Sequence, residues 1–327
     1  MRLDIIVPHY KEPWETCKYL FDSIMMQRGI RFDDIKVMVV NDGDCLLDVE
    51  NFKGYPYKIE YLIKPHGGIS DTRNYGIEHS DADYIMFCDI DDGFLNNYSL
   101  HLFFKGMEEG FDLCVSNFVE ETFDSDGNQT IVAHDQDVTF VHGKAYRRQF
   151  LIDYDLKFDP QMTLHEDGYF NLLVYAAAHN EGKIKKLTTP TYMWRWNEES
   201  VVRKDRGDFV LKTYEDVMLT RIGVCQELKR RGYIPDYQSA MAMTVLNSYY
   251  DFQKPRYHLP QNEKHLRKAE KAFKKFWLMY RDEFNGFTNR FIADTAALAR
   301  ENAVQNGMLM EQQDLRSFLK HIEYEVK

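Results

Sequence analysis

The sequence predicts an α/β domain with a mostly parallel sheet, followed by an all-helical C-terminal domain. In the first 125 residues, short apolar runs alternate with segments of helical periodicity, as in βαβ units. Several of these apolar runs end in clusters of polar residues. From residue 208 almost to the end, the periodicity is helical throughout. The 327 residues suffice for two domains, and we expect them at residues 1–207 and 208–327.

The first domain begins with a clear strand and a clear helix. Residues 3–8 form a continuous apolar run, which is typical of buried parallel strands. Pro13 then stands where the first turn of a helix accepts proline. Further strands are expected at 35–42, 57–63 and 84–90, and helices at 69–80 and 98–109. Residues 126–205 are expected to mix loops, short strands and short helices.

Helices of the second domain are expected over residues 210–231, 237–252, 263–284, 288–303 and 312–324. Gly232 suits the left-handed position that ends many helices. Residues 263–284 place lysines and arginines on one face and aromatic residues on the other. The plain interpretation is a solvated basic face over a packed core. Binding of an anionic acceptor, a membrane surface or nucleic acid is the functional alternative, and the helices could also form a homo-oligomer.

The net charge of −11 is unevenly distributed. Of the 41 basic and 52 acidic residues, 19 and 15 lie from Leu211 onward, so the first 210 residues carry −15 and the rest +4. An acidic domain that binds an anionic substrate must recruit positive charge from a metal or from placed basic side chains. No apolar run reaches the roughly 18 residues that span a bilayer. We therefore expect a cytoplasmic protein, with the inner membrane face as a peripheral location.

The five cysteines are scattered, and no two of them form a C-x-x-C pair that would indicate zinc or redox chemistry. Polar residues instead gather at the predicted strand ends, at 8–10, 41–43 and 89–92. Ligands of parallel sheets bind beyond the carboxyl ends of the strands. The three clusters therefore predict one ligand crevice.

Three aspartates stand together after the fourth predicted strand, namely Asp89, Asp91 and Asp92. Carboxylates this close repel one another unless a cation lies between them, and Mg²⁺ or Mn²⁺ would serve. Such an ion can also hold phosphates. A solvated loop that caps the next helix is the alternative, and so is a phosphatase with an Asp-x-Asp strand end. The spacing to Gly93 does not fit an EF-hand loop.

Three further signals lie elsewhere in the first 175 residues. Gly67 and Gly68 allow close backbone approach, and Arg73 follows on a helix from which it could reach a phosphate. Asp42 could accept a hydrogen bond from a nucleobase, although Asp-Gly pairs usually form turns. Glu166 and Asp167 begin a helix, where acidic residues usually complement the helix dipole but could also supply a general base.

Taken in order, these motifs resemble family 2 of the inverting glycosyltransferases, of the bacterial or phage type, with the GT-A fold. The resemblance covers roughly the first 200 residues and includes residues 140–151 and 192–204. It rests on Pro8-x-Tyr10, Asn41-Asp42-Gly43, Gly67-Gly68-x5-Arg73-Asn74-x-Gly76, Asp89-x-Asp91-Asp92 and Glu166-Asp167. The usual Asp-Asp-Gly-Ser reads Asn41-Asp42-Gly43-Asp44 here, so the second acid is kept.

The resemblance implies roles for individual residues. Asp42 would accept from the base N–H, and Arg73 would lie near the diphosphate or base. Asp89 would contact the ribose, Asp91 would bind the metal with help from Asp89, and Asp167 would be the base beside Glu166. The remaining donor contacts would be Pro8, His9, Tyr10, Glu12, Gly68 and Ile90. The sugar or acceptor contacts would be His142, Gly143, Lys144, Trp194 and Arg195.

One of the metal ligands that the resemblance implies for some relatives is missing from this chain. Some relatives add a histidine after the closing strand, and this chain has no histidine between Asn180 and Tyr257. Asp91, donor oxygens and water are therefore expected to hold the ion, with His142 and His165 as further candidates. Asp92 would support the turn or the outer coordination shell.

The activity implied is the metal-dependent transfer of a sugar from a nucleotide diphosphate, with UDP as the expected nucleotide, to a hydroxyl. Mn²⁺ or Mg²⁺ would stabilise the leaving diphosphate, and a carboxylate on the opposite face would take the acceptor proton. The expected acceptor is a cell-surface glycan or polymer, which could be anionic. The alternatives are a nucleotidyltransferase of similar fold, a phage enzyme that glycosylates a hydroxymethylated DNA base, and a non-catalytic binding module.

Overall fold

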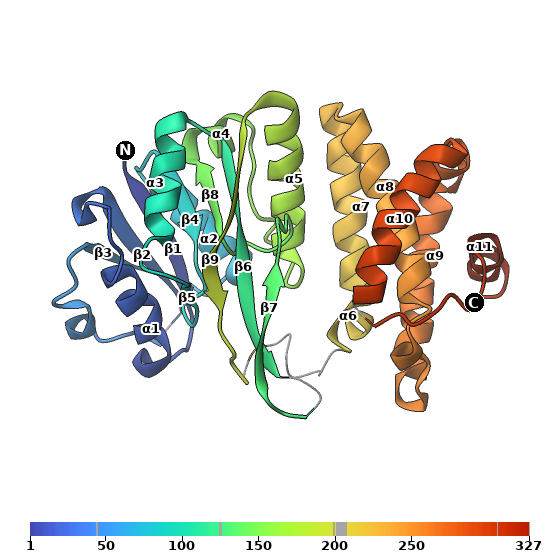
Figure 1. Ribbon diagram of the computed structural model, residues 1–327, viewed down its shortest axis with the longest axis horizontal. Coiled ribbons are helices and arrows are strands. Elements are labelled where there is room, and N and C mark those ends of the chain that lie inside the picture. The colour runs from blue at the N-terminus through green and yellow to red at the C-terminus, as the bar shows by residue number, and fades with distance from the viewer. Residues whose placement is uncertain (44, 124–125, 199, 201–207, 306, 327) are drawn as a thin grey trace. The chain divides into compact units, whose positions relative to one another are not determined.

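The computed structural model describes residues 1–43, 45–123, 126–198, 200, 208–305 and 307–326. The chain divides into two compact units, Met1–Asn197 and Glu198–Lys327. The first unit is a sheet flanked by helices, and the second consists of helices (Figure 1). The boundary expected at residue 207 lies outside the described residues.

In the described part of the first unit, nine strands form one sheet. They are β1 (Leu3–His9), β2 (Ile35–Asp42), β3 (Lys58–Lys64), β4 (Tyr84–Phe87), β5 (Gly93–Phe94), β6 (Leu113–Phe123), β7 (Gln129–His134), β8 (Lys144–Arg147) and β9 (Ile184–Trp194). Across the sheet their order is β3-β2-β1-β4-β8-β6-β9-β5, and β7 pairs with β6.

The parallel half of the sheet agrees with the sequence prediction. β1 pairs in parallel with β2 and β4, and β2 pairs in parallel with β3, so their carboxyl ends share one edge. The fourth strand, however, ends at Phe87 and not at Ile90. The Asp92 N–H donates to the Asp89 carbonyl at 3.1 Å, and this turn takes the chain out of the ladder.

The other half of the sheet is mostly antiparallel. β8 pairs antiparallel with β4 and with β6, and β7 forms an antiparallel pair with β6. β9 runs parallel to β6, with a shift in register between Ser116 and Phe118. Most of these strands come from the stretch where the sequence indicated only a mixture of short elements. Their pairing brings the end of β9 next to the aspartate turn.

Helices cover both faces of the sheet. They are α1 (Trp14–Met25), α2 (Ile69–His79), α3 (Ser99–Glu109), α4 (Arg148–Asp153) and α5 (Glu166–Glu181), with 3-10 turns η1 (Phe32–Asp34) and η2 (Val49–Phe52). Buried residues of α1 and α3 form one core with Ile5, Val7 and other residues of the same sheet face. On the opposite face, Phe170 of α5 packs on Phe87 with ring centroids 5.9 Å apart.

Gly76 lets α2 approach β1 closely. A Cβ atom at Gly76 would lie 2.4 Å from Cγ2 of Ile6, which is far inside van der Waals contact. Arg73 stands one turn earlier on the same helix. The close packing therefore also holds Arg73 at a fixed distance from the strand ends.

The second unit is helical as expected, although the helix expected over 210–231 is divided at Thr213 and the helix expected from residue 237 begins at Ile234. Its helices are α6 (Phe209–Lys212), α7 (Tyr214–Arg231), α8 (Ile234–Asp251), α9 (Glu263–Asn285), α10 (Asn289–Gln305) and α11 (Leu315–Tyr324), with η3 (Pro255–His258) and η4 (Pro260–Asn262). Gly232 ends α7 with a φ of 78°, as predicted. Phe273, Phe276 and Tyr280 of α9 are buried on its core face. Among the helices described, none combines the length and apolar character needed to cross a bilayer.

Candidate active site

The ends of β1 and β2 are joined by a buried polar contact. Nδ2 of Asn41 lies 2.7 Å from Nδ1 of His9, and Nε2 of His9 lies 2.9 Å from the carbonyl oxygen of Glu12. Both side chains are buried, as is Pro8 before them. In this structure His9 therefore links the end of β1 to the end of β2. Its contact with the donor stays a prediction.

The turn after β1 presents an aromatic surface. Oε2 of Glu12 accepts hydrogen bonds from the backbone N–H groups of Tyr10 and Lys11 at 3.0 and 3.1 Å, so Glu12 shapes this turn. The ring of Tyr10 is partly exposed and stacks on His66 with a centroid distance of 4.7 Å. Sequence reasoning missed His66. His66 stands directly before Gly67, in a loop that was expected to approach the donor, and this position could have indicated it as a site residue.

Asp42 is surrounded by donors from the loop after β3. Its Oδ1 accepts from Lys64 Nζ at 2.6 Å and from the Gly67 N–H at 2.8 Å, and its Oδ2 accepts from the Gly68 N–H at 2.8 Å. Burial opposes ionisation of Asp42, but Lys64 and the two backbone donors outweigh burial and lower its pKa. Asp42 therefore fixes the glycine loop, and its contact with a nucleobase stays a prediction.

Arg73 connects carboxylates that come from two distant places in the sequence. Its buried guanidinium donates through one terminal nitrogen to Glu166 Oε1, at 2.9 Å, and to Asp167 Oδ1. The other terminal nitrogen donates to Asp89 Oδ1 at 3.1 Å. Both terminal nitrogens are thus bound to carboxylates, whereas the sequence suggested that Arg73 faces a diphosphate or base. One guanidinium compensates three carboxylates, which leaves the cluster with excess negative charge.

Asp167 is a half-buried acid of this cluster. It lies in the first turn of α5, and its Oδ2 accepts from the Val141 N–H at 3.3 Å. Burial raises the pKa of Asp167, Arg73 opposes the rise, and the neighbouring carboxylates of Glu166 and Asp89 add to it, giving a value of about 8. A carboxylate with a raised proton affinity at a rigid helix start is suited to take a proton from a hydroxyl.

The other two aspartates after β4 have different surroundings. Oδ2 of Asp91 accepts from Nδ2 of Asn197 at 2.7 Å, and burial together with Asp89 raises the pKa of Asp91. Asp92 is buried, and it accepts from the Tyr192 hydroxyl at 2.9 Å and from the Arg195 N–H at 2.8 Å. Asp92 therefore ties the aspartate turn to the end of β9.

Possible ligand atoms for a divalent cation gather beside this turn. Asp89, Asp92 and His142 each offer one such atom, and these atoms lie within 4.8 Å of one another. Burial lowers the pKa of His142 to about 4, and its buried Nδ1 has no hydrogen-bond partner. A neutral imidazole and two carboxylates fit Mn²⁺ or Mg²⁺. The structure thus places the predicted ligand Asp89 beside Asp92, which was expected only to support the turn or the outer shell, and beside His142, which was expected as a further candidate.

The remaining predicted residues border the aspartate turn or hold its neighbours. His142 stacks on Tyr192, with ring centroids 5.0 Å apart, and Trp194 packs against His142 at 5.2 Å. The Arg195 guanidinium lies 4.0 Å from the centroid of Tyr19, a residue that the sequence did not indicate. Buried supporting positions are Ile90 in the turn, Gly143 with a φ of 63°, and Lys144, whose Nζ donates to the Phe140 carbonyl.

A family comparison adds to this geometry. Residues 4–162 match the model of Glycosyl transferase family 2. These residues are just under half of the chain, so the match supports the resemblance to family 2. The matched region contains Asp42, Arg73 and the aspartate turn, and it ends shortly before Asp167. This agrees with the resemblance expected from the motifs.

Two curated relatives are similar to parts of this chain. The uncharacterized glycosyltransferase EpsJ of Bacillus subtilis (strain 168) is 27% identical over 223 residues, which are 61% of this chain and 62% of EpsJ. The minor teichoic acid biosynthesis protein GgaB of the same strain is 35% identical over 80 residues, which are 23% of this chain and 9% of GgaB. The chain thus spans about three fifths or less of the length of these relatives.

Solved structures of TarS from S. aureus share the fold. One TarS structure aligns with a TM-score of 0.63 at 17% identity, over 98% of this chain and 55% of TarS. TarS 1–349 in complex with UDP-GlcNAc aligns with a TM-score of 0.63 at 18% identity, over 94% of this chain and 93% of that chain. At such identities the likeness establishes the fold alone. It confirms a GT-A α/β domain followed by helices.

Proposed function

We propose that this chain is a glycosyltransferase that moves a sugar from a nucleotide-diphosphate donor, with UDP as the nucleotide, to an acceptor hydroxyl with inversion. The observation that carries the proposal is the Arg73 cluster, which joins Asp89 at a strand end to Asp167 at the start of α5. The match of residues 4–162 to the glycosyl transferase family 2 model supports the reaction class. The UDP-GlcNAc complex of TarS 1–349 supports the choice of UDP.

The donor would bind beyond the carboxyl ends of β1, β2 and β4. Tyr10 and His66 offer an aromatic surface for the base, and the glycine loop held by Asp42 allows the backbone to come close. Asp89 would hold a divalent cation together with Asp91, or together with Asp92 and His142. Such an ion, when bound, supplies the charge that stabilises the departing diphosphate.

Asp167 would deprotonate the acceptor hydroxyl as it attacks the anomeric carbon. The hydroxyl oxygen forms the new bond, the bond to the nucleotide diphosphate breaks, and the proton goes to the carboxylate of Asp167. A single displacement inverts the anomeric centre, so no covalent enzyme intermediate is required. Arg73 keeps Asp167 in place and connects it to the donor side of the site.

The acceptor side would include Trp194 and Arg195, with His142, Gly143 and Lys144 behind or beside them, as the family resemblance implies. A hydroxyl of a cell-surface glycan or polymer is the proposed acceptor. The name of GgaB, a teichoic acid biosynthesis protein, agrees with a polymer acceptor. The similarity to GgaB covers only a short segment of this chain. The helical unit would contribute to acceptor binding or to oligomerisation.

Product analysis tests the reaction class. Purified protein is incubated with Mn²⁺ and a panel of nucleotide sugars, and the products are separated by chromatography. We expect release of the nucleoside diphosphate, slowly to water and faster to a suitable hydroxyl acceptor. In a parallel reaction with added pyrophosphate, formation of nucleoside triphosphate and sugar 1-phosphate would instead indicate a nucleotidyltransferase. Failure to bind or turn over any nucleotide sugar would overturn the proposal.

A further inference from the structure

We propose that α9 carries a binding site for a flexible polymer with regularly spaced phosphodiesters, which on the proposed function is the polymer that bears the acceptor hydroxyl. The site is the basic row, defined as Lys264, Lys268 and Lys271. These residues are exposed and follow the i, i+4, i+7 spacing, which places them along one side of the helix. At 1.5 Å per residue the row is roughly 10 Å long.

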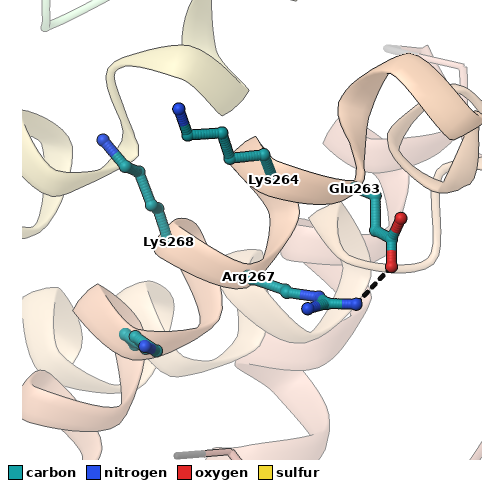
Figure 2. A pocket seen from close by; sticks show the side chains of 5 residues that line it. Glu263, Lys264, Arg267 and Lys268 are labelled. Carbon is teal, nitrogen blue, oxygen red and sulfur yellow. Dashed lines mark hydrogen bonds and ion pairs between the residues drawn. The ribbon is translucent and has the colours of Figure 1, made fainter.

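The basic row lines a shallow hollow of about 310 Å³ together with Glu263 and Arg267. Figure 2 shows Lys264 and Lys268 extending to the same side, whereas Arg267 turns toward Glu263, with which it forms an ion pair. Four cations therefore share one carboxylate. A ligand that enters this hollow meets a net charge of +3.

The lysines of the basic row have no ion-pair partner among the residues that the structure describes. Some other cations of the helical unit do have partners, such as Lys229 with Glu283 at 2.9 Å and Arg281 with Glu323 at 2.8 Å. The chain as a whole has an excess of acidic residues. Arg316 and Lys320 of α11 also have no ion-pair partner among the described residues, so the basic row is distinguished by three lysines at helical spacing along one hollow.

The position of the basic row is unfavourable for the helix itself. Like charges at i, i+4 destabilise a helix by a few tenths of a kcal/mol per pair. Lys264, in the first turn of α9, also opposes the helix dipole, whereas Lys268 and Lys271 lie beyond that turn. A face that served only solubility would gain nothing from this arrangement, whereas an anionic ligand would relieve it.

A flexible chain of phosphates fits the basic row better than a membrane does. Helices that bind membranes insert large apolar residues beside their cations. Between the lysines of the row, Ala269 is buried and Leu266 is only partly exposed; the exposed Leu278 and Met279 lie beyond its C-terminal end. Lys275 continues the row, but it shares its hollow with Glu215 and Asp216.

A duplex nucleic acid also fits poorly. It is rigid and carries a dense array of charges, so tight binding requires many phosphate contacts over a broad basic surface. The basic row is a single line of three lysines on one helix of an acidic chain. A flexible polymer can instead place successive phosphates against successive lysines, which stand about 5–6 Å apart at their Cβ atoms.

Binding of a fluorescent poly(glycerol phosphate) to the full chain tests the inference, with fluorescence anisotropy as the readout. Neutralisation of three phosphates predicts a loss of affinity of roughly 20-fold between about 50 and 200 mM salt, if the slope per phosphate resembles that of single strands. The triple variant K264E/K268E/K271E should lose at least tenfold in affinity. The triple variant K264Q/K268Q/K271Q should also lose affinity. It replaces the charge-reversed variant in the test if that variant fails to fold.

A matched control has the same change in net charge on other helices of the unit, namely R290E/R316E/K320E. These three residues are exposed and lie outside the basic row. Retained binding in this control supports a local site, whereas an equal loss in both triples would overturn it. Tighter binding to anionic lipid vesicles or to duplex DNA than to the polymer would also overturn the proposal.

The assay separates this inference from the proposed function. Release of UDP from a nucleotide sugar to water requires the first unit only, so the basic-row variants should keep it. Normal UDP release without any polymer binding would reject the inference and leave the proposed function standing. Polymer binding by a chain that turns over no nucleotide sugar would reject the proposed function instead.

Discussion

Arg73 shows how strongly this site depends on one buried cation. Its guanidinium is the shared partner of Asp89, Glu166 and Asp167, which come from distant parts of the sequence. Removing such a partner would leave three half-buried carboxylates without their shared cation, which is destabilising. The site is therefore better tested by changing the carboxylates than by changing Arg73.

Conservative changes at Asp91 and Asp167 should separate donor binding from transfer. If Asp91 shares the ion with Asp89, the metal-dependent binding of UDP should be lost in D91N, because an amide is a weaker ligand for a divalent cation than a carboxylate; unchanged binding would favour Asp92 and His142 as the ligands. In D167N binding should stay within about twofold, while transfer should fall roughly 10²–10⁴-fold, the usual contribution of a general base. Calorimetry measures binding, and release of UDP measures transfer. Equal loss of both properties in D167N would contradict the assignment of the base.

The raised pKa of Asp167 has a consequence for stability. Its pKa is 3.8 in an unperturbed carboxyl and about 8 in the folded chain, mainly because of burial. Between these values the folded state holds a proton that the unfolded state releases, so this group lowers stability as the pH rises from about 4 to about 8. We expect D167N to have a higher Tm than the parent chain, by a difference that grows over this pH range.

Thermal melts of the metal-free protein from pH 5 to pH 8 measure this difference. The control is D33N, which changes an exposed carboxylate and should alter Tm little at any pH. A Tm difference between D167N and the parent that stays constant with pH would show that Asp167 titrates normally. A destabilised D167N at pH 8 would show that its pairing with Arg73 outweighs its burial.

The sequence identified individual chemical groups better than their partners. Asp89, Arg73 and Asp167 were all predicted as site residues, because polar groups directly after apolar strands and at helix starts stand out. The ion pairs among them were not predictable, since nothing local in the sequence indicates that a guanidinium at residue 73 faces residue 167. His66 and Tyr192 were missed for the same reason, because each acts through a contact with a residue far away in the sequence.

At the scale of elements, the packing of α2 on β1 determines where Arg73 lies. G76A should destabilise the chain by about 1–3 kcal/mol, because the added methyl group would overlap with Ile6. The matched control is G168A in α5, where a Cβ would meet nothing within 4 Å, and it should stabilise by roughly 0.5–1 kcal/mol through helix propensity. Urea unfolding measures both. Equal effects of the two substitutions would mean that α2 can shift away from β1 at little cost.

The two halves of the sheet differ in how well the sequence predicts them. β1 and β2 are buried on both faces, so each appears as an uninterrupted apolar run. β9 is mostly half-buried and polar, and its partner β6 lies far away in the sequence, so neither period nor spacing indicates their pairing. The same pairing places Tyr192 beside Asp92, which is why the outer part of the site was unpredictable.

At the scale of the whole chain, charge links the acidic first part to the need for a cation. The first 210 residues carry −15, and the Arg73 cluster keeps excess negative charge where a diphosphate would bind. We therefore expect UDP to raise Tm only when Mn²⁺ or Mg²⁺ is present, by an amount equivalent to about 2.7 kcal/mol at a hundredfold excess over Kd. A thermal-shift series with UDP and EDTA, Mn²⁺ alone, and UDP with Mn²⁺ measures this. A full shift in EDTA would show that the protein supplies enough positive charge by itself, and the cation would then have no role in donor binding.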